Sequence, residues 1–246
     1  KLEAALVAHP DAKIVAFVHA ETSTGALSDA KTLCALAKQH DCLSIVDAVT
    51  SLGGVPLYVD DWGIDALYSG SQKCLSAPPG LSPVTFSQAA INVLDNRKTK
   101  VQSWFLDLTM VKNYWQGAKR AYHHTAPVSA MFAMRESLRL VLEEGLENRF
   151  KRHQQNHELL RDVLEGLGFE FLVEKEYRLP MLNAVRVPKG VDELAIRKQL
   201  LNEYNIEVGG GLGPFAGKIW RVGLMGESAT INHVNVLLGA LKTIIK

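Results

Sequence analysis

Short runs of apolar residues, many of them β-branched, alternate with helix-like segments in the first third of the chain. Strands are predicted over four ranges: 14–18, 43–46, 66–68 and 83–86. A helix is predicted over 28–40, where Leu33, Leu36 and Ala37 share one face and Ser28 is the expected N-cap. The run at 43–46 is apolar on both faces, which is typical of a buried parallel strand. This alternation predicts βαβ units and an open, mostly parallel α/β sheet.

From about residue 127 the pattern changes to long helices followed by short strands. Helices are predicted at 128–144 and 147–167, with Gly145 between them. The pattern then predicts strands at 169–173 and 183–187, a helix at 191–204, strands at 206–208 and 219–223, and a helix at 232–245. This is an α+β layout. We therefore expect a large α/β domain over 1–145 and a smaller C-terminal α+β domain over 146–246.

Composition and charge narrow the class of protein. Of the 246 residues 47% are hydrophobic and 22% charged, and the net charge is +1, which is ordinary for a globular protein and does not indicate nucleic-acid or membrane binding. Cysteines 34, 42 and 74 lack metal-binding spacing, so free thiols in a reducing intracellular compartment are predicted: the cytoplasm, or a peroxisome or mitochondrion in a eukaryote. Lys1 stands inside a helix-like segment, and we expect a preceding stretch to be missing.

A carboxylate and an amine follow two of the predicted strands. Asp47 comes at the end of the strand at 43–46, and Lys73 follows the strand at 66–68 after a few small residues. Because ligands of such sheets lie beyond the carboxyl ends of the strands, the two groups are expected at one rim. Such a pair suits pyridoxal 5′-phosphate (PLP), whose aldehyde forms a Schiff base with lysine and whose ring nitrogen pairs with a carboxylate. The alternatives are an Asx turn or helix cap for Asp47 and a surface-loop lysine.

Other polar residues leave both functional and structural interpretations open. The turn at 22–25 is predicted to bind an anion or a phenolate, or else to cap a helix. In the Tyr-His-His-Thr segment at 122–125 we expect no metal, and a phosphate contact by Tyr122 or Thr125 is favoured. Arg221 stands in an apolar strand, where it would clamp a substrate carboxylate or form an internal salt bridge. The glycine-rich stretch at 209–214 lacks the ending of a phosphate-binding Walker loop.

Taken together, these segments are similar to the class V aminotransferases of PLP fold type I, above all the alanine–glyoxylate and serine–pyruvate enzymes. The resemblance is carried by segments spread over almost the whole chain: 19–25, 46–49, 53–57, 68–73, 77–80, 122–125, 145–148, 210–214 and 220–223. It implies the large PLP-binding domain of that fold type, without its N-terminal part, and the smaller C-terminal domain. The phosphate-cradling turn and the ring-stacking aromatic residue of the family would precede Lys1.

The resemblance also implies a role for each candidate residue. Lys73 would be the Schiff-base and proton-transferring lysine, Asp47 would pair with the ring nitrogen, and Val49 would pack on the ring. Thr22 would bond the phenolic oxygen, and Gln72 the phosphate. Tyr122 and Thr125 would reach the phosphate of the neighbouring subunit, which implies a homodimer. Arg221 would bind the carboxylate of the amino or oxo acid.

The implied activity is transamination in two half-reactions, from a small amino acid, alanine or serine, to a 2-oxo acid, glyoxylate. Within the fold, 3-hydroxykynurenine or 2-aminoethylphosphonate transaminases, kynureninases and cysteine desulfurases are the alternatives. A desulfurase needs a nucleophilic cysteine on a mobile loop, whereas Cys74 adjoins the lysine and Cys34 lies within a predicted helix. A non-catalytic PLP-binding domain and a cofactor-free α/β domain are the alternatives from other classes.

Overall fold

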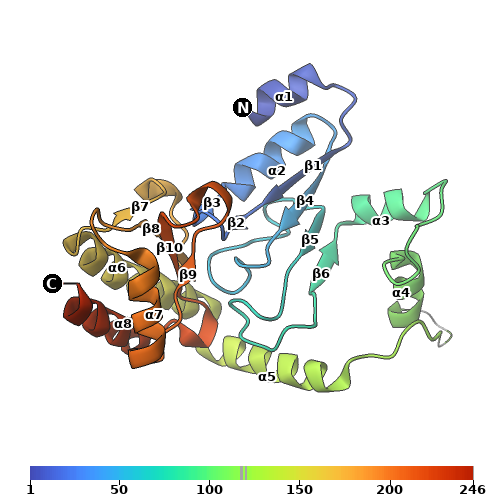
Figure 1. Ribbon diagram of the computed structural model, residues 1–246. Coiled ribbons are helices and arrows are strands. Elements are labelled where there is room, and N and C mark those ends of the chain that lie inside the picture. The colour runs from blue at the N-terminus through green and yellow to red at the C-terminus, as the bar shows by residue number, and fades with distance from the viewer. Residues whose placement is uncertain (117–118, 120, 246) are drawn as a thin grey trace.

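A four-stranded sheet forms the first half of the molecule in the computed structural model, which describes residues 1–116, 119 and 121–245 (Figure 1). Its strands are β1 (Ile14–Val18), β4 (Leu43–Asp47), β5 (Ala66–Tyr68) and β6 (Val84–Phe86), in that spatial order. The first three are parallel, and β6 runs antiparallel to β5. The predicted α/β class with a mostly parallel sheet is confirmed.

Two helices precede or link the first strands, namely α1 (Leu2–Ala8) and α2 (Ala30–Gln39). The N-cap of α2 was predicted at Ser28, and this prediction is wrong by one residue. The N-cap is Asp29, whose carboxylate accepts the Thr32 backbone N–H at 3.1 Å. The Ser28 hydroxyl instead donates to the Val18 carbonyl at 2.9 Å. Ser28 therefore ties the segment before α2 to the end of β1.

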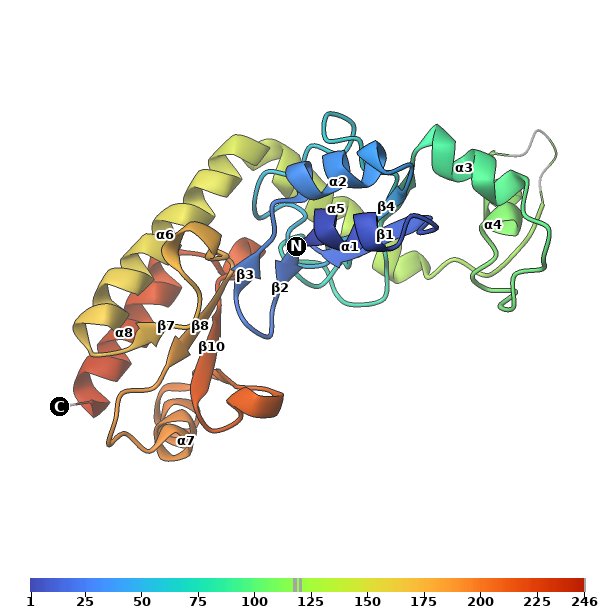
Figure 2. The same ribbon diagram turned by 90° about the horizontal axis from the view of Figure 1, so that it is seen from above.

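A second, antiparallel sheet occupies the later part of the chain. Its order is β7 (Glu170–Phe171), β8 (Leu182–Arg186), β10 (Ile219–Gly223) and β9 (Gly209–Gly210). The strand predicted at 206–208 is wrong, because the residues that pair with Trp220 and Arg221 are Gly210 and Gly209. The helices of this part are α5 (Val128–Glu144), α6 (Leu146–Gly166), α7 (Glu193–Tyr204) and α8 (Ile231–Ile244). Figure 2 shows α6 and α8 side by side against one face of this sheet.

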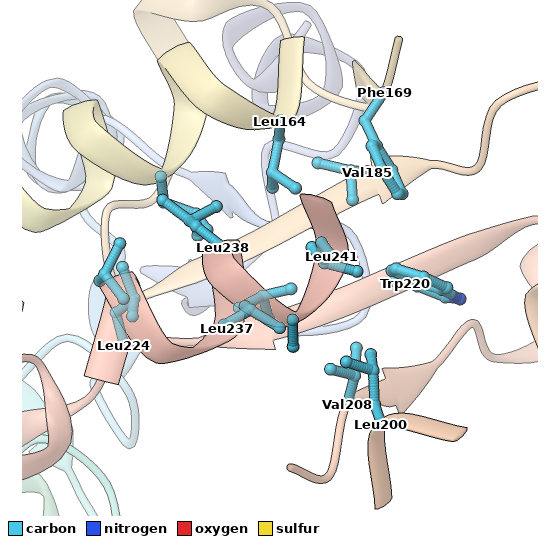
Figure 3. Close-up of a cluster of buried hydrophobic side chains, with 14 of the residues drawn as sticks. Leu164, Phe169, Val185, Leu200, Val208, Trp220, Leu224, Leu237, Leu238 and Leu241 are labelled. Atoms are coloured by element: carbon cyan, nitrogen blue, oxygen red, sulfur yellow. The ribbon is translucent and has the colours of Figure 1, made fainter. Parts of the chain in front are cut away.

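The largest hydrophobic core lies between this second sheet and its helices. Figure 3 shows Leu164 of α6 and Leu238 and Leu241 of α8 beside Val185 and Trp220 of the sheet. All five are at most 4% exposed. At roughly 1.5–3 kcal/mol for each large apolar side chain buried, this core holds the C-terminal elements together.

The two sheets meet at a small hairpin of β2 (Ala20–Glu21) and β3 (Ala26–Leu27). At its tip Gly25 has φ +77°, and a Cβ there would lie 2.8 Å from the Leu182 carbonyl oxygen, so the turn packs directly on the start of β8. The first sheet lies within 14–86 and the second within 170–223. The division into domains at residues 145 and 146 stays a prediction.

Two further helices lie between the sheets in the chain, α3 (Gln88–Asp95) and α4 (Leu108–Gln116), and the hydrophobic pattern did not predict them. Within the described residues, no helix combines the length and the apolar character that crossing a membrane requires.

Candidate active site

The carboxylate of Asp47 is oriented by two hydrogen bonds at the end of β4. Its Oδ1 accepts the Val49 backbone N–H at 2.9 Å, which is the Asx turn considered from the sequence. Its Oδ2 accepts the hydroxyl of Tyr68 at 2.8 Å. Tyr68 is the register partner of Asp47 on the parallel strand β5, so the two side chains stand on the same face. This hydrogen bond raises the pKa of Tyr68 above its ordinary value.

Lys73 lies half-buried in the loop that connects β5 to β6. This loop is tied to the segment that follows Asp47, because the Ser69 hydroxyl donates to the Ala48 carbonyl at 2.9 Å and the Cys74 thiol to the Thr50 carbonyl at 3.2 Å. The structure therefore brings the loops that carry the predicted carboxylate and amine to one rim of the sheet. Among the described residues, no carboxylate forms an ion pair with Lys73.

Val49 and Gln72 flank a bare stretch of backbone at Gly70. A Cβ on Gly70 would lie 3.3 Å from Val49 Cγ1 and 2.7 Å from Gln72 Oε1. Because Gly70 has no side chain, the space between Val49 and Gln72 stays open. Val49 is the residue expected to pack on the PLP ring, and Gln72 is the one expected at its phosphate. This open space beside Gly70, the oriented carboxylate of Asp47 and the amine of Lys73, which has no carboxylate partner among the described residues, together fit the groups that PLP requires.

Thr22 and Arg221 come together although 199 positions separate them. Arg221 donates through Nη1 to the Thr22 carbonyl at 3.4 Å and through Nε to the Gly210 carbonyl at 2.8 Å. In the part of the chain that the structure describes, Arg221 has no carboxylate partner, so the predicted internal salt bridge is absent there. Thr22 stands in the turn between β2 and β3, and not at the start of a helix, so the capping alternative for this turn is wrong.

Tyr122 and Thr125 do not join the other candidates. Their hydroxyl groups bond each other in the exposed segment before α5, and Tyr122 packs edge-on against Tyr114. The neighbouring His123 and His124 bond through their Nδ1 atoms at 2.8 Å. Over residues 1–116, 119 and 121–245, no group of three or more His, Cys, Asp or Glu side chains is arranged to hold a metal ion.

Two residues at this rim were assigned no role from the sequence. Tyr68 is one, and its position opposite Asp47 in a parallel register is the signal that could have revealed it. The other is His19, whose backbone N–H donates to the Asp47 carbonyl at 2.9 Å. Burial lowers the pKa of His19 to about 4, so its imidazole is neutral near pH 7.

Comparison with known proteins shows the family of this chain. The model of the class V aminotransferases matches residues 2–217. The chain belongs to this family. The enzymes of the class depend on PLP, which agrees with the donor set at the rim of the first sheet. The expected family, fold class and cofactor are thus confirmed.

Individual relatives are similar over almost the whole chain. The alanine–glyoxylate aminotransferase of Callithrix jacchus is 44% identical over 227 residues, which are 91% of this chain and 55% of the relative. The (S)-ureidoglycine–glyoxylate transaminase of Bacillus subtilis is 37% identical and covers 95% of this chain and 60% of its own length. The crystal structure of an alanine–glyoxylate aminotransferase from Nostoc sp. superposes with a TM-score of 0.95 at 51% identity, covering all of this chain and 64% of that one. The chain thus spans little more than half the length of these curated relatives.

Proposed function

We propose that the protein to which this chain belongs transfers an amino group from a small amino acid, alanine or serine, to a 2-oxo acid, for which glyoxylate is the best candidate. The observation that carries the proposal is the placement of an oriented carboxylate, Asp47, and of the loop that carries Lys73 at one rim of the sheet, in a class V aminotransferase chain. The names of the two curated relatives support glyoxylate as the amino acceptor.

PLP would be held here by residues from three segments. Asp47 would pair with the ring nitrogen, Val49 would pack on the ring, Thr22 would bond the phenolic oxygen, and Gln72 would bond the phosphate. When bound, PLP supplies an electron sink that stabilises negative charge at the α-carbon of the substrate. The two hydrogen bonds to Asp47 keep its carboxylate facing one way, so it is preorganised for a cationic partner.

Lys73 would move the proton that transamination requires. In its neutral form the Nζ would accept a proton from the α-carbon of the amino-acid substrate and pass it to the aldehyde-derived carbon of PLP; with the oxo-acid substrate it would carry a proton in the reverse direction, to the α-carbon. The loop that carries Lys73 is tied to the segment that follows Asp47, which favours a fixed geometry for this transfer.

Arg221 would bind the carboxylate shared by the amino-acid and oxo-acid substrates. Its Nε and Nη1 are committed to the Gly210 and Thr22 carbonyls, which fixes the plane of the guanidinium. A planar guanidinium held in this way suits recognition of a carboxylate.

A homodimer completes the proposal. Tyr122 is 70% exposed, and its hydroxyl pairs only with Thr125 in the described part of the chain, so both can serve a site on a second copy. We propose that Tyr122 and Thr125 contact the phosphate of the PLP bound by the partner subunit. The three cysteines are free and buried, which supports a reducing intracellular compartment, with the cytoplasm as the simplest choice.

The test is an assay of the full-length protein for glycine formation from glyoxylate, with L-alanine, L-serine or (S)-ureidoglycine as the donor. The third donor is included because one relative carries it in its name. Turnover is expected with alanine or serine, and it should disappear in Lys73→Ala. Lys151→Ala, at an exposed position on α6, is the matched control and should behave like the unaltered protein. Substantial turnover in Lys73→Ala would refute the lysine assignment, and turnover with none of the donors would refute the activity.

A further inference from the structure

A buried guanidinium outside the candidate site is bonded to the residue next to Lys73. Arg149 of α6 has 0% of its side chain exposed. Its Nη1 donates to Glu144 at 2.6 Å and to Glu227 at 2.8 Å, and its Nη2 donates to the Cys74 carbonyl at 2.8 Å. The two carboxylates neutralise the buried charge, and the third bond links α6 to the loop that carries the lysine.

That loop depends on such outside partners. Between β5 and β6 the chain forms no helix or strand; some of its carbonyls accept hydrogen bonds within the loop, and others accept them from outside it. The Ser137 hydroxyl of α5 donates to the Leu75 carbonyl, and the Glu227 backbone N–H donates to the Ser76 hydroxyl at 2.8 Å. Each of the three residues after Lys73 is thus held by α5, by α6 or by the turn after β10.

The turn after β10 is fitted closely to the same loop. Gly226 has φ +57°, and a Cβ there would lie 1.8 Å from Ser76 Oγ and 2.7 Å from the Cys74 carbonyl oxygen. Its backbone N–H donates to His153 Nε2 at 3.0 Å, which fixes the turn to α6. The loop therefore rests on a surface built from helices and a turn that all follow it in the sequence.

We propose that Arg149 and Ser137 are positioning residues for Lys73: they hold the carbonyls of Cys74 and Leu75 and so fix the backbone from which the lysine side chain extends. The inference rests on the proposed function, in which the Lys73 amine must meet a reacting atom. A misplacement of about 1 Å at a reacting group costs on the order of 100-fold in rate. A charge-assisted bond to the Cys74 carbonyl is about twice as strong as a neutral one, which suits an anchor at this point.

The neighbouring arginine of α6 provides a matched control. Arg152 also donates to Glu144, through Nε at 2.6 Å and Nη2 at 2.9 Å, whereas its Nη1 donates to the Gly226 and Ala229 carbonyls at 2.9 and 2.7 Å. It shares the ionic cluster without touching the loop. Arg149→Lys and Arg152→Lys both keep the positive charge and remove the planar fork, but only Arg149→Lys removes a direct bond to the Lys73 loop, at the Cys74 carbonyl, whereas Arg152→Lys removes bonds to the Gly226 and Ala229 carbonyls.

The experiment measures the reactivity of Lys73 directly in the full-length protein freed of cofactor. Pyridoxal 5′-phosphate is added, the product is reduced with borohydride after increasing times, and the label on Lys73 is counted by peptide mass spectrometry. We expect Arg149→Lys to label Lys73 about 10-fold or more slowly, and Arg152→Lys to stay within about 3-fold of the unaltered protein. Hydrogen exchange at the backbone amides of residues 74–77 should accelerate in Arg149→Lys and not in Arg152→Lys.

Equal labelling and equal exchange in the two variants would overturn the inference. If Arg149→Lys fails to fold, Ser137→Ala provides the same test, because it removes only the hydroxyl that holds the Leu75 carbonyl; unaltered labelling and exchange in that variant would equally overturn it. A lack of label on Lys73 in the unaltered protein is a separate result, which would refute the proposed function and the inference with it.

Discussion

Acidification from about pH 7 to about pH 5 should destabilise the fold through its buried histidines, because burial lowers the pKa values of His19, His153 and His157. His19 is 3% exposed beside Asp47, and His153 is 0% exposed beneath the Lys73 loop. Burial is the largest cause in each case, and it lowers the pKa of both side chains from 6.5 to about 4. The nearby charges of Arg149 and Arg152 lower the pKa of His153 further, while the Glu144 carboxylate raises it.

The sign and the size follow from proton linkage. Between pH 6.5 and pH 4 the unfolded chain binds a proton at each histidine and the folded chain does not, so stability is lost as the pH falls. At pH 5 His19 and His153 each cost about 2 kcal/mol relative to pH 7, or about 4 kcal/mol for both. The pKa of Glu144 is lowered to about 2 by its bonds to Arg152 and Arg149. The stability that this carboxylate gives the fold is therefore lost at a lower pH than the stability lost through the histidines.

The assay is urea unfolding of the full-length protein, followed by tryptophan fluorescence at both pH values. His153→Gln should lower the loss of stability between the two pH values by about 2 kcal/mol, because an amide oxygen can still accept the Gly226 N–H that bonds His153 Nε2 at 3.0 Å but does not titrate in this range. The reasoning is refuted if the unaltered protein loses less than about 0.5 kcal/mol between the two pH values, or if His153→Gln retains the full slope.

Three further changes give predictions of different kinds. Arg221→Ala should raise the KM of both the amino-acid and the oxo-acid substrate by about 30-fold or more, as expected when a bond between charged groups is lost; steady-state kinetics in which neither KM changes would make Arg221 structural. Leu160→Ala, at a fully buried position of α6, should lower the free energy of unfolding by about 2–5 kcal/mol, measured by urea titration. Burial raises the pKa of the Cys74 thiol to about 12, so iodoacetamide should alkylate it only after unfolding; rapid alkylation of the folded protein, seen by mass spectrometry, would contradict this.

The placement of Asp47 and Lys73 could be predicted because it depends on local pattern. An apolar run that ends in a polar residue marks the carboxyl end of a buried strand, and neighbouring parallel strands present these ends at one edge. The pairing of Asp47 with Tyr68 in the observed register follows from the same rule. The residue pattern left the turn that contains Thr22 and the strand that contains Arg221 with two interpretations each, and the resemblance to a family favoured the functional one; the role of Gln72 came from the resemblance alone.

Elements that depend on capping or on distant pairing were not predicted. Helix α3 begins after Ser87, whose hydroxyl accepts the Ala90 N–H at 3.1 Å, and this N-cap was the available signal. Strand β9 consists of two glycines with no strand propensity and exists because β10 pairs with it. The bond from Arg149 to the Cys74 carbonyl joins residues 75 positions apart, and neither residue type indicates it.

These long-range bonds explain why the candidate site needs both halves of the chain. The first sheet alone places Asp47, but the guanidinium of Arg221 reaches the Thr22 carbonyl from β10, and the Lys73 loop is held by Ser137, Arg149 and the turn at Gly226. A shift of the second sheet relative to the first would move Arg221 and the turn at Gly226 together. The distance between the amine of Lys73 and the guanidinium of Arg221 therefore depends on how the two sheets are placed, because Lys73 extends from the loop after β5 and Arg221 from β10.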